Sequence, residues 1–431
     1  MSDSAAAMAV PAAPPAGRGG SHRTYVLTML ALVGFMNAVD KIVMSMFMEP
    51  IKKEFQLTDT QLGLVTGLAF SLLGVVAAVP LARLADRWNR KWIVGGCLLI
   101  WSVMTAASGA VTSFAQLFAA RVAVGIGEAG SGPASHSMIG DYYPRELRPR
   151  ALAIFNVGGY LGLLGGMFGG GVLVQTVGWR AGFLWLGVVG VILAVIFHFT
   201  VHEPARVDLP APPAAAGGAL RALFGDLGAF TWLLLAFGMA SITSWSVVAW
   251  MPSYFARAFS LPPAQIGLGL GLCLGLGTAL GTVLGGQIGV RFGTKTPGWA
   301  ARLAAATGLI GLPMYLGCFH AQNPMLAFAL LFGTFVVGGL AVGPLFAMLQ
   351  DMVAPNARAT AVAVLGLAGA VFGQGLGPVV VGMFSDWLQT GRTGAEGLRL
   401  ALTSVVCISP ITALLFWQVA RSMHRQRAAA H

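Results

Sequence analysis

Five ionisable side chains interrupt two long apolar runs of this sequence. They are Asp40 and Lys41 in the first run and Arg121, Glu128 and His136 in the fourth. On membrane-insertion scales each charge costs about 2.5–3.5 kcal/mol at the centre of a bilayer, so such side chains must pair, lose their charge or face water. Surroundings of low dielectric constant disfavour the charged form of a carboxyl group, whereas a neighbouring Arg favours it. A carboxyl group between these opposing effects can load and release a proton when its access to water changes.

The spacing of these residues predicts that two of them pair. If the first run is a helix that ends near Phe47, Asp40 lies seven residues from that end, or roughly 10 Å at 1.5 Å per residue. Arg121 lies seven residues from the start of the fourth run near Phe114, so both lie at the same depth. Glu128 follows Arg121 by seven residues, almost two turns, and therefore projects from the same face about one half-thickness deeper.

Proton coupling is the chemistry that this arrangement favours. We hypothesise that Glu128 carries the coupling proton, with Asp40 as the alternative. Arg121 and Lys41 would act as counter-ions or as the anchor for an anionic group of a substrate, which makes all four candidate substrate-binding residues. A static cluster of buried ion pairs is the structural alternative.

The composition excludes a soluble globular protein. Apolar residues make up 56% of the 431 residues, and Asp, Glu, Lys and Arg together only 10%, against roughly 25% in a soluble domain. The net charge of +11 does not indicate nucleic-acid binding, because the Lys and Arg residues collect in short loops between apolar runs. We therefore expect an integral membrane protein whose partners are the lipid bilayer, protons and a small-molecule or lysolipid substrate.

No motif in the sequence indicates an enzyme or a cofactor site. The four cysteines lie singly inside apolar runs and lack the spacing of a zinc or redox site. Residues 125–130 (GIGEAG) satisfy the dinucleotide fingerprint, but that fingerprint has meaning only between a strand and a helix, and here it lies within an apolar run. A membrane hydrolase would have only Glu128 and His136 as candidate catalytic residues. We expect no enzymatic activity, no cofactor and no metal site.

The apolar runs are long enough to be transmembrane helices, which take about 20 residues each. Six runs precede a Pro/Ala/Gly-rich linker at 201–228 and six follow it. We predict helices near 25–47, 61–85, 92–112, 114–140, 150–173, 180–200, 229–257, 264–290, 297–319, 325–350, 359–384 and 398–420. The predicted fold class is an all-α membrane protein of two pseudo-symmetric six-helix bundles, 25–200 and 229–420. A disordered tail at 1–24 and a short tail at 421–431 flank them.

The distribution of basic residues predicts the orientation. With the amino terminus inside the cell, 17 of the 26 Lys and Arg residues fall in inner segments and 6 in outer ones. Cytoplasmic loops carry an excess of Lys and Arg. Both termini and the linker are therefore expected in the cytoplasm.

The two halves resemble each other in sequence. Residues 81–91 align with 285–295 at an offset of 204, and residues 141–153 align with 351–363 at an offset of 210. The matching order and the similar offsets favour a duplicated six-helix unit. Duplicated halves with a site near the midplane of the bilayer are typical of secondary transporters.

Glycine spacing predicts which helices meet between the halves. Stripes of glycine at every fourth residue begin at Gly158, Gly277 and Gly369 in the fifth, eighth and eleventh runs, with a shorter stripe in the second. Small residues at that period let two helices lie close together. We predict that these stripes line a symmetric interface between the halves, and that segments 241–255 and 340–351 line the second half of a central cavity.

Three stretches of the sequence resemble one known family. They are residues 121–159, residues 82–91, and residues 178–187 followed by EPAR at 203–206. These stretches are similar to the Spinster-type branch of the major facilitator superfamily. The resemblance implies alternating access around a cavity between the halves. It also implies proton-linked export of lysolipids or sphingoid phosphates, as in animal members.

The resemblance also implies roles for single residues. Arg121 matches the family's arginine motif in the fourth helix, which is associated with proton coupling. Asp86, Arg87, Arg90 and Lys91 match the loop between the second and third helices that latches one half against the other.

Four positions depart from the family pattern: Ala82 and Asn89 replace the usual glycines of the loop between the second and third helices, and two others alter a charged position. Lys41 stands where relatives usually carry Arg, which replaces a planar fork by a point charge. Val290 stands where the corresponding loop of the second half would carry Asp, so a charge latch there is one-sided.

The sequence thus predicts a monomeric, proton-coupled secondary transporter in the inner (plasma) membrane of a bacterium. We expect a partly apolar central cavity and an amphipathic, anionic small molecule or lysolipid as substrate. A proton symporter of small organic acids is the alternative within transport. A non-transporting receptor with the fold of a transporter is the alternative from another class.

Overall fold

The computed structural model describes residues 20–144, 146–204, 228–292, 298–353 and 357–429. Residues 1–19 of the predicted amino-terminal tail and residues 205–227 of the predicted linker lie outside this part of the chain. The described residues are helical almost throughout and contain no strand. They form an all-α protein, as predicted.

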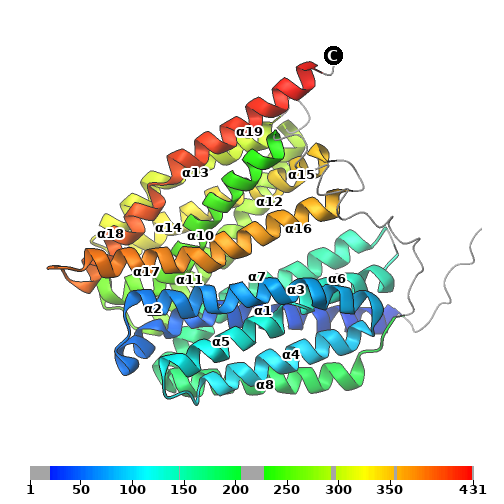
Figure 1. The fold of residues 1–431 in the computed structure, drawn as a ribbon, viewed down its shortest axis with the longest axis horizontal. Helices are drawn as coiled ribbons and strands as arrows, with labels where there is room; N and C mark the ends of the chain where they lie inside the picture. Colours follow the sequence, from blue (N-terminus) through cyan, green and yellow to red (C-terminus); the bar gives the residue numbers. More distant parts are fainter. Residues whose placement is uncertain (1–19, 145, 205–227, 293–297, 354–356, 430–431) are drawn as a thin grey trace, which may run out of the picture.

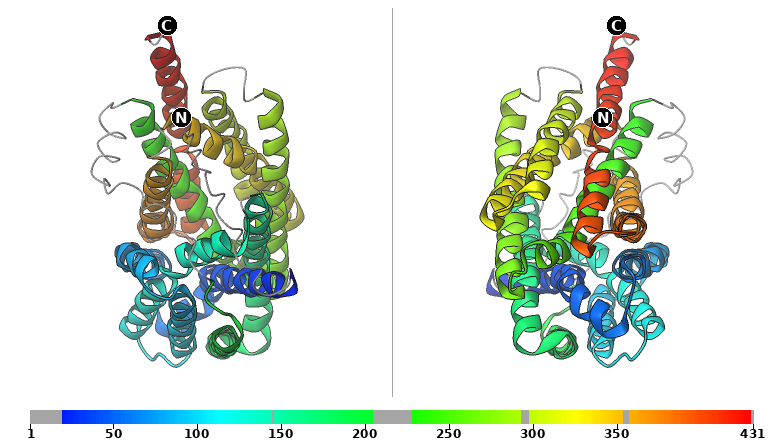
Figure 2. Two further views of the ribbon diagram at one scale, coloured as in Figure 1. Left: turned by 90° about the vertical axis from the view of Figure 1, so that its right-hand side faces the viewer. Right: turned by 90° about the vertical axis from the view of Figure 1, so that its left-hand side faces the viewer.

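Each half is a bundle of helices. Among the described residues, π-helical segments (η) interrupt one helix of the first half and two of the second. The first half contains α1 (Gly20–Phe55), α2 (Asp59–Gly63), η1 (Leu64–Leu68), α3 (Ala69–Arg87), α4 (Arg90–Ser108), α5 (Phe114–Glu128), α6 (Ser131–Tyr142), α7 (Arg148–Thr176) and α8 (Gly178–Thr200). The second half contains α10 (Ala229–Phe259), α11 (Pro263–Gly271), η2 (Leu272–Gly277), α12 (Thr278–Phe292), α13 (Trp299–His320), α14 (Pro324–Gly339), α15 (Val342–Met352), α16 (Arg358–Ala368), η4 (Gly369–Leu376), α17 (Gly377–Leu388), α18 (Gly394–Val406) and α19 (Ser409–Ala429). Figure 2 shows the two halves as two groups of helices, one above the other.

Among the described residues, eleven helices are long and apolar enough to cross a membrane, against the twelve predicted. The predicted run at 114–140 accounts for the difference, because it folds as α5 and α6 with a break at Ala129. Pro133 has no N–H for a helical bond to the Ala129 carbonyl, which favours a break there. The second half repeats this break between α14 and α15, where Pro344 follows Leu340 by four residues. The repeated break supports the duplication predicted from the sequence.

Two helices extend into segments that were predicted to be loops or tails. Helix α1 begins at Gly20, inside the predicted tail at 1–24, and continues to Phe55. Helix α19 runs through most of the predicted tail at 421–431, to Ala429. Charged residues occupy both extensions. Hydropathy locates the part of a helix inside the bilayer but not the polar turns that continue beyond it.

Three of the four predicted glycine stripes pack within the halves. A Cβ at Gly158 of α7 would collide with the carbonyl oxygen of Ala31 in α1, and Gly281 of α12 lies against α14. Gly373 of η4 lies against Trp245 of α10. The prediction that the stripes line the interface between the halves is therefore wrong for the three stripes that begin at Gly158, Gly277 and Gly369. A period of four identifies a smooth helix face but does not identify the helix that covers it.

The shorter stripe in the second run, together with Gly171 of α7, does bring the halves together, as predicted for that stripe. A Cβ at Gly67 of η1 would collide with the carbonyl oxygen of Gly375 in η4. A Cβ at Gly171 of α7 would collide with the carbonyl oxygen of Pro263 at the start of α11. Because these approaches are backbone against backbone, a side chain at either glycine would separate the halves.

The halves meet at one end of the molecule, which we call the closed end. There α2 and α17 lie side by side, and the largest hydrophobic cluster contains Phe47 and Leu62 of the first half with Trp250 and Val381 of the second. The described termini lie at the opposite end, which we call the terminal end (Figure 1). There α3 and α16 diverge, and the main contacts of α6 and α16 are with helices of their own halves. The halves are thus packed together at the closed end and apart at the terminal end.

Candidate functional site

Asp40 of α1 and Arg121 of α5 form an ion pair inside the first half. The Arg121 Nη1 atom lies 3.4 Å from Asp40 Oδ2, and the hydroxyl group of Thr105 in α4 donates a 2.6 Å hydrogen bond to Asp40 Oδ1. Asp40 is 4% exposed and Arg121 is 1% exposed. The pairing expected from their equal depth is therefore present.

Glu128, at the end of α5, extends this ion pair into a larger cluster. Its Oε2 atom accepts a 2.7 Å hydrogen bond from Asn37 Nδ2 and lies 3.6 Å from Lys41 Nζ. Its Oε1 atom is buried and has no hydrogen-bond partner among the described residues. Asp40 also lies close enough to interact with Glu128. We call Asp40, Lys41, Arg121 and Glu128 together the charge cluster.

An aromatic ring of α3 lies against both cations of the charge cluster. The Phe70 ring centre is 6.0 Å from Lys41 Nζ and 5.6 Å from Arg121 Cζ, within the range of a cation–π interaction. Helices α3 and α5 approach closely here because Gly125 has no side chain; a Cβ there would collide with the Phe70 carbonyl oxygen. Gly125 thereby allows Phe70 to reach the charges.

Sequence reasoning missed two polar partners of the charge cluster and included one residue that lies apart from it. Asn37 precedes Asp40 by three residues and Lys41 by four, a spacing that predicts one shared helix face. Thr105 carried no such signal, because α4 is far from α1 in the sequence. His136 of α6 is exposed and packs edge-on against Phe155 of α7, with 5.1 Å between the ring centres.

Lys41 connects the charge cluster to the second half. Its side chain is 30% exposed and borders a cavity of about 20 Å³, which we call the interface pocket. Thr66 and Phe70 border this pocket from the first half, and Trp245 and Gln374 border it from the second. That volume corresponds to about one water molecule.

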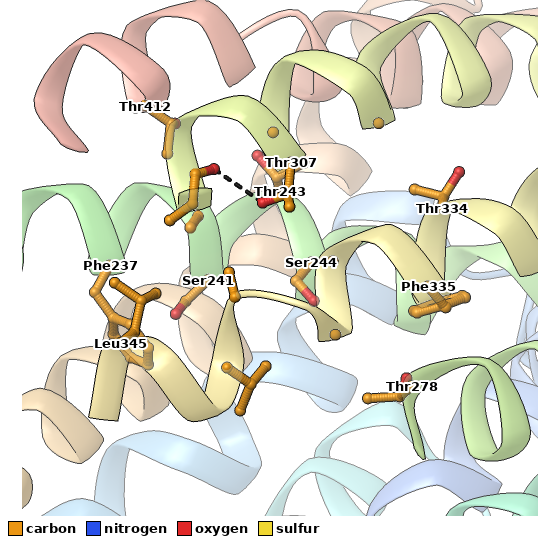
Figure 3. Close-up of a pocket in the computed structure, with 18 of the residues that line it drawn as sticks. Phe237, Ser241, Thr243, Ser244, Thr278, Thr307, Thr334, Phe335, Leu345 and Thr412 are labelled. Carbon is orange, nitrogen blue, oxygen red and sulfur yellow. Dashed lines mark hydrogen bonds between the residues drawn. The ribbon is translucent and has the colours of Figure 1, made fainter. Parts of the chain in front are cut away.

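A cavity of about 510 Å³, which we call the C-half cavity, is lined by the second half apart from Leu163 of α7 (Figure 3). It falls within the usual size range of small-molecule sites. Its lining combines apolar side chains with hydroxyl groups and includes no charged side chain. The residues labelled in the figure are Phe237, Ser241, Thr243, Ser244, Thr278, Thr307, Thr334, Phe335, Leu345 and Thr412. Residues from both predicted lining segments, 241–255 and 340–351, therefore line this cavity.

Arg257 of α10 binds the first half at the closed end. Its Nη1 and Nη2 atoms each lie 2.8 Å from an oxygen of Asp59, and its Nε lies 2.9 Å from Glu49 Oε1. Asp59 is fully buried and also pairs with Lys52. Arg257 thus forms a bidentate ion pair across the two halves.

Helix α17 strengthens the same contact. Ser385 and Gln389 donate hydrogen bonds of 2.6 Å and 2.8 Å to Asp59 Oδ2. The Asp386 carboxylate accepts hydrogen bonds from the backbone N–H groups of Asp59 and Thr60, at 2.9 Å and 2.8 Å. We call these residues, with Arg257, Glu49 and Lys52, the closed-end network. Sequence analysis treated its basic members only as loop charges.

Arg90, one of the four predicted latch residues, binds within the first half. It is buried and pairs with Asp141 at the end of α6 and with Glu203 after α8. Arg90 therefore joins α4, α6 and the end of α8 at the terminal end, which is the end where the halves are apart.

The other predicted latch residues lie beside Arg90 around the turn from α3 to α4. Arg87 is exposed, and the backbone N–H of Lys91 donates a 2.9 Å hydrogen bond to Glu203. The side chain of Asp86 lies outside the described part of the structure. A latch between the halves stays a prediction for a conformation in which the terminal end is closed.

Comparison with known proteins gives matches over most of the chain. A model of the Major Facilitator Superfamily matches residues 30–378. An MFS-type efflux pump of Mycolicibacterium smegmatis is 33% identical over 414 residues, which cover 95% of this chain and 96% of that protein. A probable galactarate/D-glucarate transporter of Bacillus subtilis is 32% identical over 200 residues, 44% of this chain and 43% of that protein.

One solved structure matches the fold closely. It is a bacterial homologue of the human lysosomal transporter Spinster, in an inward-facing and unoccupied conformation. Its TM-score is 0.87 at 27% sequence identity, and the match covers 95% of this chain and 99% of that one.

Proposed function

Because the chain belongs to the Major Facilitator Superfamily and is related to the Spinster-type transporters, we propose that it is a proton-coupled secondary transporter. It moves an amphipathic, anionic small molecule or lysolipid by alternating access. In this proposal the protein works as a monomer in the plasma membrane of a bacterium, with both termini in the cytoplasm.

The position of Lys41, between Glu128 and the interface pocket, is the observation that carries the proposal. Lys41 is the cation within 4 Å of Glu128 among the described residues, and it also faces the interface pocket. When a substrate anion binds Lys41, Glu128 loses part of its compensating charge in surroundings of low dielectric constant. The protonated form of Glu128 then accompanies the bound anion.

This competition for Lys41 couples the two ligands. If the anion favours protonation of Glu128, then by thermodynamic reciprocity a proton on Glu128 favours binding of the anion. Proton and anion therefore bind together and cross the membrane in the same direction. Arg121 pairs with Asp40 throughout, so that the second carboxylate stays compensated.

The two ends of the molecule support alternating access. The closed-end network and the glycine contacts hold the halves together at one end, while the halves are apart at the other. With both termini in the cytoplasm, this conformation is open to the inside of the cell. The reverse conformation requires the closed-end network to break and the residues near Arg90 to meet the second half.

The cavities favour an amphipathic substrate. The interface pocket offers the Lys41 charge, whereas the C-half cavity offers apolar and hydroxyl surface without a charge. A lysolipid has an anionic group and an apolar chain that fit these two environments. A proton symporter of small organic acids is the second candidate, supported by the likeness to the galactarate/D-glucarate transporter.

Flux into proteoliposomes tests the proposal. We expect lysophosphatidate, added outside vesicles that contain a pH-sensitive dye, to acidify the lumen, and D-glucarate to have no effect. Glu128→Gln should abolish the acidification. Glu396→Gln is the matched control, because Glu396 lies in an exposed capping box of α18 that Gln also completes.

Each other outcome identifies a different error. Acidification by D-glucarate alone would support the organic-acid symporter. Absence of flux for both compounds, in vesicles whose protein binds lysophosphatidate, would support a receptor. Full acidification by the Glu128→Gln variant would refute the role of Glu128.

A further inference from the structure

The interface pocket and the C-half cavity share one wall. Trp245 and Val248 of α10 line both of them. The two residues are three positions apart and therefore lie on the same face of the helix. On one side of this face are the Lys41 charge and the Gln374 amide, and on the other is a cavity without a charged side chain.

The interface pocket is too small for an anionic headgroup as it stands. Its volume of about 20 Å³ corresponds to about one water molecule, whereas a phosphate group alone carries four oxygens. A headgroup that reaches Lys41 must therefore displace a side chain. Among the side chains that border both cavities, the Trp245 indole is the larger.

The contacts of Trp245 are those of a ring held by packing. Its Cδ1 atom lies 2.7 Å from the position that a Cβ would take on Gly373, so the ring rests on the backbone of η4. The next residue of η4 is Gln374, which borders the interface pocket. By contrast, Trp250 of the same helix is fully buried and donates a 2.9 Å hydrogen bond from its Nε1 to the Pro378 carbonyl. Trp250 is anchored, and Trp245 is partly exposed toward the cavities.

The backbone beside Trp245 is also suited to rearrangement. Residues Gly369–Leu376 form a π-helical segment, and π-helical bulges inside α-helices are frequent at functional sites. A shift of η4 would move both the surface on which Trp245 rests and the Gln374 side chain.

We propose that Trp245 is a movable partition whose displacement joins the two cavities into one amphipathic binding site. The anionic headgroup lies between Lys41 and Gln374, and the apolar chain lies in the C-half cavity. Gln374 supplies amide donors to the headgroup, and Lys41 supplies the charge. This inference deepens the proposed function by naming the site and the ligand class, an alkyl chain that carries one anionic headgroup.

Equilibrium binding of two matched probes tests the partition. The full chain in lipid nanodiscs is titrated with radiolabelled dodecyl phosphate and with dodecanol, which has the same chain without the anion. We expect Trp245→Ala to bind dodecyl phosphate about tenfold more tightly than the native chain, because no ring has to be displaced. Dodecanol binding should stay within about twofold, because its chain needs the C-half cavity alone.

Two further variants and one control complete the design. Addition of Lys41→Gln to Trp245→Ala should weaken dodecyl phosphate binding about tenfold and leave dodecanol unchanged. Trp245→Phe keeps a smaller aromatic ring on Gly373 and should give an intermediate affinity. If Trp245→Ala does not fold, the Phe variant tests the partition in its place. Trp232→Ala, at an exposed position of the same helix outside both cavities, should match the native chain.

The inference is overturned by any of three results. Equal changes for both probes would make Trp245 an ordinary wall of the C-half cavity. An unchanged affinity in the Trp245 variants would show that no partition is displaced. No binding of dodecyl phosphate to any variant would refute the ligand class. Because the titration uses neither a proton gradient nor flux, failure of proton-coupled transport would leave its outcome intact, and the two proposals can fail separately.

Discussion

Replacement of Arg257 by Ala should shift the protein away from the conformation that is packed together at the closed end. The variant leaves Asp59, which is fully buried, without its bidentate partner. Removal of one member of a buried ion pair costs about 3–5 kcal/mol. We take about 3 kcal/mol, since Lys52 still binds Asp59 and the Glu49 partner is partly exposed.

This cost falls on one conformation only. When the closed end opens, water reaches Asp59 and solvates it, so the loss of Arg257 is small there. A difference of about 3 kcal/mol corresponds to about a 100-fold change in the ratio of the two conformations, at 1.4 kcal/mol for each factor of ten. A minor conformation with the closed end open should thereby become readily detectable.

Distances between spin labels at the closed end measure this shift. Labels at Lys53→Cys and Thr390→Cys occupy exposed positions on opposite halves, in a background that lacks the exposed Cys407. Arg257→Ala should raise the population of long distances. Arg257→Lys, which keeps the charge but not the planar fork, should give a smaller increase. Arg392→Ala is the matched control, because Arg392 donates to a carbonyl of its own half.

An unchanged distance distribution in a folded Arg257→Ala variant would refute this reasoning. It would mean that the glycine contacts and the hydrophobic cluster hold the closed end without help from the ion pair.

Three further predictions concern stability and conformation. Gly67→Ala should destabilise the closed end by about 1–3 kcal/mol and lengthen the spin-label distances, because the new Cβ would meet the backbone of η4. Gly96→Ala is the control and should leave the distances unchanged, because the space around Gly96 is open. Thr105→Val should lower thermal stability by about 1.5–3 kcal/mol through loss of the hydrogen bond to the buried carboxylate of α1, and an unchanged melting curve would contradict that assignment. Arg90→Ala should lower the free energy of unfolding by about 3 kcal/mol, because it removes the cation that pairs with two carboxylates. Arg87→Ala, at an exposed position, should have little effect, and equal melting temperatures for the two variants would count against the buried network.

The architecture followed from the sequence because the bilayer restricts the possible structures strongly. Apolar runs of fixed minimum length predicted the order of the helices and eleven of the twelve expected spans among the described residues, and the constant rise of a helix placed Asp40 level with Arg121. The break at Ala129 was missed, although Pro133 was a visible signal for it. Hydropathy alone treats a bent helix and a straight one alike.

The contacts between the halves could not be predicted in the same way. Arg257 and Asp59 lie 198 residues apart and occupy positions that the duplication does not relate. The recurrence of glycine at every fourth residue correctly indicated close helix packing, but the stripe that begins at Gly158 faces α1 within its own half. Which face meets the other half depends on the rotation of each helix, which no local pattern in one sequence encodes.

The charge cluster lies in the first half, whereas the C-half cavity is lined almost entirely by the second. The ends of α1 and α10 correspond at an offset of 204, the offset that also aligns the loops of the two repeats, and at this offset Lys41 corresponds to Trp245. The broken helix α5–α6 of the first half corresponds to α14–α15 of the second. When the two are aligned at their breaks, Gly339 occupies the position of Glu128. The position that carries a cation in one half therefore carries an indole in the other, and both border the interface pocket. In the proposed mechanism, Lys41 and Trp245 are therefore the corresponding residues through which proton binding in the first half and chain binding in the second are coupled.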